Sequence, residues 1–128
     1  MTRTIRLKRL TRSADFRRVR AGRRHCAMPG LVLQAREMPR SVRAQEADDV
    51  ARIGFTVSRK VGKAVARNRA KRRLRAAAAD ILPRAGTPGM DYVLIGRRHT
   101  LDRPYTALKA DMETALKKLD PENRKDTS

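Results

Sequence analysis

One stretch of this chain, residues 50–82, constrains the fold more than any other. Between Val50 and Ala79 it carries ten lysines or arginines and no aspartate or glutamate. Solvated helix surfaces usually mix both signs of charge, so that neighbouring side chains form ion pairs. A run of one sign is unfavourable unless a polyanion outside the chain supplies the countercharge. The stretch therefore predicts a surface that binds a polyanion.

Residues 65–82, the second half of this stretch, have the periodicity of a helix. At roughly 100° per residue, small or apolar side chains share one narrow arc that can lie against a core. These side chains are Ala66, Ala70, Leu74, Ala77 and Ile81. The rest of the helix surface is almost wholly cationic. We expect this surface to bind RNA through six residues: Arg67, Asn68, Arg69, Lys71, Arg72 and Arg75.

The first half of the stretch, residues 50–58, alternates in the way of a strand with one buried face. The apolar face carries Ala51, Ile53, Phe55 and Val57. The opposite face carries Arg52, Gly54, Thr56 and Ser58. Because the last three side chains are small, we expect this second face to be open and to form the floor of a groove.

Composition agrees with a nucleic-acid partner. The 128 residues carry a formal net charge of +19, and the pI is about 11.6. An anionic membrane surface is the other polyanion that such a chain can meet, but a helix with an alanine inner face has little to bury in lipid. No apolar run is long enough to span a bilayer. The single cysteine, Cys26, fits a reducing compartment, and we expect the protein in the cytoplasm.

The remaining segments indicate an α+β fold, a small mixed sheet with covering helices. Helices are expected at 13–21, 65–82 and 105–119, and strands at 31–36, 50–58 and 91–96. The order is therefore α-β-β-α-β-α. The strand at 91–96 is nearly continuous in apolar residues and should be central. We expect one RNA-binding domain over residues 1–128, with a loose basic arm at 1–12, loops at 37–49 and 83–89, and a polar tail at 120–128.

The chain lacks the residue clusters that catalysis and metal binding require. Its acids are scattered, and no histidine, cysteine or carboxylate group has metal-ligand spacing, so we expect no catalytic and no metal-binding residue. A ribosomal or other structural RNA-binding protein is the main alternative. Binding to duplex DNA is disfavoured, since the 65–82 helix offers only Asn68 among the side chains that typically read base edges beside arginine.

The residues around the basic run also carry a family resemblance. The sequence Arg67-Asn68-Arg69-Ala70-Lys71-Arg72, preceded by residues 58–62 (Ser-Arg-Lys-Val-Gly), resembles the signature of the bacterial ribonuclease P protein subunit. The resemblance implies a left-handed strand–helix–strand crossover. It also implies two partners, a catalytic RNA subunit and precursor tRNA, with no protein partner required. In that family the RNA removes the 5′ leader of precursor tRNA with bound Mg²⁺.

The resemblance and the open strand face together place the single-stranded leader in a groove beside the 65–82 helix. Nine residues are expected to border it: Phe16, Arg17, Arg20, Phe55, Thr56, Ser58, Arg59, Lys60 and Lys63. Phe16 is a stacking platform for a base in this interpretation, and core packing is its alternative role. Many relatives carry an aromatic residue where this chain has Arg20, and some carry a tyrosine near Gln34. An arginine can stack on a base as well.

Overall fold

A mixed sheet of five strands, in the order β1-β4-β5-β3-β2, forms the middle layer of the protein. The structure is a computed structural model, and it describes residues 4–121. The strands are β1 (Arg6–Arg9), β2 (His25–Met28), β3 (Leu31–Glu37), β4 (Val50–Val57) and β5 (Met90–Gly96). The helices are α1 (Ser13–Ala21), α2 (Arg40–Gln45), α3 (Ala64–Ala85) and α4 (Tyr105–Lys118), with 3₁₀ turns η1 (Arg59–Val61) and η2 (Arg98–Thr100).

The six predicted elements are all present, but β1, β2 and α2 are additional elements, so α-β-β-α-β-α is not the complete order. Strand β5 is the central strand, as its apolar run predicted, because it pairs in parallel with β4 on one side and antiparallel with β3 on the other. Helix α3 joins β4 to β5, so these neighbouring parallel strands are connected by a strand–helix–strand crossover. The left hand of this crossover stays a prediction of the family resemblance.

The prediction of a loose arm over residues 1–12 is wrong for residues 6–9. They form strand β1, which pairs in parallel with β4 from Arg6 opposite Val50 to Arg9 opposite Ile53. The flanking apolar side chains of Ile5 and Leu10 are buried. The positive charge of Arg6 is neutralised by an ion pair of 3.0 Å with Asp49. The basic strand was missed because its acidic partners lie about forty positions away in the chain. Residues 1–3 lie outside the described part.

Three further segments differ from the prediction. The loop expected at 37–49 contains helix α2, which has no fully buried residue and so leaves no apolar periodicity in the sequence. Strand β2 was not predicted, and it pairs antiparallel with β3 as a hairpin. Helix α3 continues through Pro83 to Ala85, because the amide of Gly86 still donates to the carbonyl of Leu82 over 2.9 Å. Residues 122–128 of the expected tail lie outside the described part.

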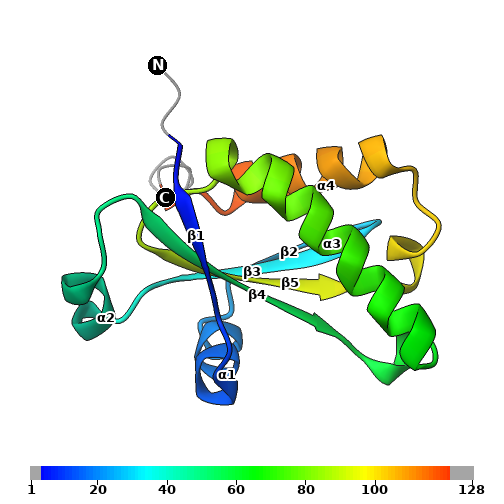
Figure 1. Cartoon of the computed structure of the whole chain (residues 1–128), viewed down its shortest axis with the longest axis horizontal. Helices are drawn as coiled ribbons and strands as arrows, with labels where there is room; N and C mark the ends of the chain where they lie inside the picture. The colour runs from blue at the N-terminus through cyan, green and yellow to red at the C-terminus, as the bar shows by residue number, and fades with distance from the viewer. Residues whose placement is uncertain (1–3, 122–128) are drawn as a thin grey trace.

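The helices cover the two faces of the sheet unequally. Helices α3 and α4 lie on one face and α1 on the other (Figure 1). The predicted inner arc of α3 is confirmed, since Ala70, Leu74, Ala77 and Ile81 are fully buried. Ala66 is half-buried. The larger core lies on this face, between the sheet and both long helices. Under α1 there is only a small second cluster around Leu10, Val19 and Val93.

Candidate RNA-binding interface

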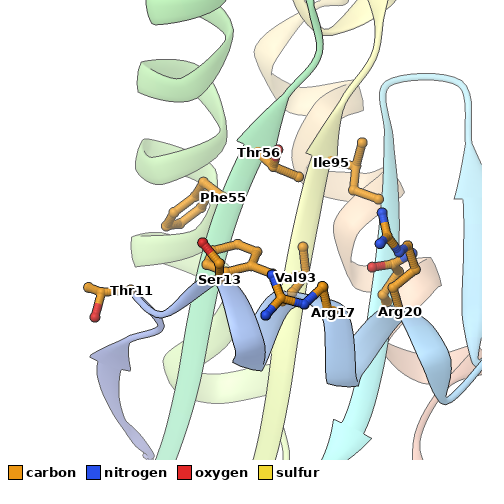
Figure 2. A pocket seen from close by; sticks show the side chains of 10 residues that line it. Thr11, Ser13, Arg17, Arg20, Phe55, Thr56, Val93 and Ile95 are labelled. Atoms are coloured by element: carbon orange, nitrogen blue, oxygen red, sulfur yellow. The ribbon is translucent and has the colours of Figure 1, made fainter.

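A groove of about 380 Å³ opens on the α1 side of the sheet (Figure 2). Strands β3 and β5 form its floor with Gln34, Val93 and Ile95. Phe16 on α1 and Phe55 on β4 are its two aromatic residues. The remaining lining residues are polar or charged: Thr11, Ser13, Arg17, Arg20 and Thr56. The groove therefore combines a mainly apolar floor, aromatic surfaces and positive charge, the features that bind a single nucleic-acid strand.

The end of β1 explains why β4 contributes to this groove. Strand β1 pairs with β4 only as far as Ile53, and the chain then turns into α1. The following residues of β4, Phe55 and Thr56, therefore line an opening beside α1 (Figure 2). Phe55 is half-buried and packs at the edge of the larger core, and Thr56 is exposed.

The predicted open face of β4 is only partly open. Helix α1 covers Arg52 and Gly54. Arg52 pairs with Asp15 of the helix and with Asp91 beneath it, and Gly54 is packed against the ring of Phe16. Thr56 and Ser58 are exposed, as predicted. The interpretation of Gly54 as groove floor is therefore wrong, since the glycine makes room for an aromatic side chain of the same protein.

The three arginines of α1 point in different directions. Arg17 and Arg20 are exposed, and both line the groove (Figure 2). Arg18 is turned toward the sheet, where it donates to the buried carboxylate of Asp91 and, over 3.1 Å, to the carbonyl of Glu37. Only two of these arginines therefore supply positive charge to the groove.

Five of the six residues predicted for the cationic surface of α3 lie on the N-terminal half of the helix, and Arg75 is the first residue of the C-terminal half. Asn68, Arg69, Arg72 and Arg75 are exposed, and Arg67 and Lys71 are half-buried. Within residues 4–121, no acidic side chain pairs with four cations of the N-terminal half: Arg67, Arg69, Lys71 and Arg72. The C-terminal half is different, because Asp80 pairs with Lys109 at 2.9 Å and Arg84 with Glu113 at 3.6 Å. On α3, the cations without an acidic partner among the described residues thus lie between Arg67 and Arg75.

The α3 surface and the groove meet at one contact. The guanidinium of Arg75 lies 5.9 Å from the centre of the Phe55 ring, within the range of a cation–π interaction. Phe55 thereby contacts a cation of α3 while it lines the groove. The two surfaces that the sequence predicted separately are continuous in space.

Comparison with known proteins agrees with this geometry. Residues 5–120 match the model of the family described as Ribonuclease P. The chain belongs to the ribonuclease P protein family. It is 54% identical over 114 residues to the ribonuclease P protein component of Paramagnetospirillum magneticum, a match that covers 89% of this chain and 84% of the relative. It is 50% identical over 111 residues to that of Ruegeria pomeroyi, covering 86% of this chain and 84% of the relative.

A solved structure has the same fold. The RNase P protein of Staphylococcus aureus superposes with a TM-score of 0.66 at 27% identity, covering 85% of this chain and 92% of the other. The family match, which spans nearly all of the described residues, favours the ribonuclease P interpretation over a ribosomal or other structural RNA-binding protein.

The nine leader-groove residues predicted from the sequence fall into two groups. Five of them line the groove: Phe16, Arg17, Arg20, Phe55 and Thr56. The other four lie beyond the end of β4, on or beside η1, and are exposed: Ser58, Arg59, Lys60 and Lys63. The hydroxyl of Ser58 accepts from the amide of Lys60 over 3.3 Å, which caps η1. This second group connects the strand to the start of α3 and does not line the groove.

Four residues that line the groove were not predicted from the sequence: Thr11, Ser13, Val93 and Ile95. Val93 and Ile95 stand in a continuous apolar strand, so no alternation marked which of its side chains lie under α1. Ser13 is three residues before Phe16, about one helical turn, and this spacing was a usable signal.

Within residues 4–121 there is no group of three or more histidine, cysteine or acidic side chains that can hold a metal ion. No helix in that range is long and apolar enough to cross a membrane.

Proposed function

We propose that this chain is the protein subunit of a ribonucleoprotein in which RNA is the catalyst. In this proposal, the subunit binds the catalytic RNA and the 5′ leader of precursor tRNA, and the complex removes that leader. Membership of the ribonuclease P family supports the proposal. The reaction, RNA-catalysed removal of the leader, is what the sequence resemblance implies. Mg²⁺ is held by the RNA and the substrate, and no residue of this chain is assigned to it. A cytoplasmic location agrees with the lone Cys26.

The observation that carries this proposal is the continuity between the α3 surface and the groove. Unpaired cations on α3 suit the phosphates of a folded RNA, whose countercharge removes the repulsion between them. The groove has aromatic and apolar surfaces, which suit the unstacked bases of a single strand. Because Arg75 lies over Phe55, one protein can hold both RNAs side by side.

Cleavage of precursor tRNA over a series of Mg²⁺ concentrations tests the proposal. We expect the RNA subunit to need less Mg²⁺ when the protein is present, because the net charge of +19 offsets phosphate repulsion that metal ions otherwise screen. The protein without RNA should cleave nothing. Site-specific cleavage by RNA-free protein, or an unchanged Mg²⁺ requirement, would contradict it.

A further inference from the structure

Helix α1 is short and lies by itself on its face of the sheet. It has nine residues, and the apolar cluster beneath it is small. It nevertheless supplies Ser13, Phe16, Arg17 and Arg20 to the groove. The shape of the groove therefore depends on where α1 sits relative to the strands (Figure 1).

A buried carboxylate lies beneath this helix. Asp91, near the start of β5, has no exposed surface. Arg52 of β4 binds it through two hydrogen bonds, with Nε donating to Oδ1 and Nη2 to Oδ2, each over 2.7 Å. Arg18 of α1 donates a further hydrogen bond to Oδ2. Asp91 thus joins the helix to the two strands at the middle of the sheet.

Other contacts of the same residues fix the helix more closely. Asp15 of α1 lies 3.6 Å from the guanidinium of Arg52. The carbonyl of Arg18 accepts a hydrogen bond of 2.7 Å from Arg36 of β3. Together these contacts hold both the first and the middle turn of α1 against neighbouring strands.

The chemistry of this network suits positioning better than stability. Burying ion pairs costs so much hydration that well-packed apolar residues often stabilise a fold as much or more. A planar guanidinium on a carboxylate, however, allows only a narrow range of geometries. The two arginines and two aspartates also cancel in charge, so the network adds no net charge beneath the groove. The groove's positive charge is left to Arg17 and Arg20.

We infer that Asp91 is a positioning residue for the leader groove. Through Arg18 and Arg52 it holds α1 at the place where Phe16, Arg17 and Arg20 line the groove, and it does so without touching RNA. This inference rests on the proposed function, in which the groove binds the leader.

The test replaces Asp91 by asparagine in the reconstituted complex of protein and RNA. We measure the affinity for precursor tRNA with its leader and for mature tRNA. The variant should lose roughly fivefold or more of the affinity for the leader-bearing substrate, the smallest effect expected when one base-stacking surface is removed. Affinity for mature tRNA should be unchanged, because the α3 surface is intact.

Asp111→Asn is the matched control. Asp111 is a second buried aspartate, only 4% exposed, and Arg103 binds it through hydrogen bonds of 2.5 and 3.0 Å. It belongs to α4, on the opposite face of the sheet from the groove. The Asp111→Asn substitution should lower the melting temperature and leave the preference for the leader-bearing substrate at the wild-type value.

If the Asp91→Asn variant does not fold, the Arg18→Gln variant tests the inference instead. This variant removes the hydrogen bond between α1 and Asp91 while Asp91 keeps its two bonds to Arg52. Arg18→Lys should recover part of the leader preference. The inference is overturned if folded variants at position 91 or 18 keep the wild-type preference, or if Asp111→Asn loses the same amount. A wild-type complex that does not distinguish the two substrates would instead contradict the proposed function.

Discussion

The ring of Phe16 packs directly against the backbone of Gly54. A β-carbon placed on Gly54 would lie 2.5 Å from Cζ of that ring and 2.6 Å from Cε1. Real β-carbons do not come this close to other atoms, so the strand requires glycine here for α1 to lie where it does. Phe16 is half-buried and also lines the groove. Core packing and groove lining, considered as alternatives from the sequence, are both roles of this one side chain.

Gly54→Ala should therefore destabilise the protein and disturb the groove together. Overpacking of this kind typically costs about 1–3 kcal/mol in the free energy of unfolding. Denaturant unfolding measures that loss, and leader-dependent affinity measures the displacement of Phe16. Gly96→Ala is the control, because its new β-carbon would meet Cγ2 of Val57, in the larger core, at 2.7 Å. It should lower stability and leave the leader affinity unchanged. A fully stable Gly54→Ala variant would show that Phe16 moves aside freely.

Two substitutions at Phe16 should separate its roles. Phe16→Leu keeps much of the apolar packing and removes the aromatic face, so leader affinity should fall by about 1–3 kcal/mol with little change in stability. Phe16→Ala should lower both the leader affinity and the melting temperature. Affinity for mature tRNA serves as the reference in both cases. If Phe16→Leu binds the leader as tightly as wild type, the base does not stack on this ring.

The sequence predicted those parts of the fold that carry local periodicity. Helix α3 and the central strand β5 were predictable because each has a long and regular pattern. Strand β1 was not, because its lysine and arginine side chains resemble a solvated arm until Asp49 and Glu46 are brought beside them. Helix α2 has no fully buried residue, so the sequence carries no apolar periodicity that could mark it.

The site was predictable to a similar extent. The basic helix surface depends on residues of one segment, and all six predicted residues lie between Arg67 and Arg75 of α3. The groove depends on four segments, and its floor residues Val93 and Ile95 became assignable only when α1 was placed over them. The buried network of Asp91 could not be predicted at all, since its four members come from three separate elements.

Removing exposed cations from α3 should weaken RNA binding in a salt-dependent way. For the double variant Arg69→Ala and Arg72→Ala, the slope of log affinity against log salt should fall by about 0.7–0.9 for each phosphate that the protein no longer neutralises. The helix should persist, because alanine is the best helix former. The control, Arg40→Ala with Lys118→Ala, removes the same charge from exposed positions on α2 and α4. Equal slopes for the two double variants would place the RNA elsewhere.

The ion pair between Asp80 and Lys109 should make a small contribution to stability with a defined pH dependence. The hydrogen bond from Lys109 is the main cause that lowers the pKa of Asp80 from its ordinary value of 3.8. The same bond raises the pKa of Lys109 above its ordinary value of 10.5. The carboxylate therefore stabilises the fold above its unfolded pKa and loses this effect as pH falls through the lower folded value. The ammonium stabilises it below its unfolded pKa and loses this effect as pH rises through the higher folded value.

The variant Asp80→Asn tests this pH dependence. Its deficit in stability should be constant between about pH 5 and pH 9, and it should shrink below about pH 4, where the wild-type carboxylate becomes protonated. Because the pair is solvent-exposed, added salt should reduce the deficit at neutral pH. Melting temperatures of both proteins over this pH range provide the measurement. RNA affinity at neutral pH should stay at the wild-type value, because Asp80 lies in the C-terminal half of α3, beyond the exposed cations, and Lys109 belongs to α4. A stability deficit that grows as the pH falls would contradict a lowered pKa of Asp80.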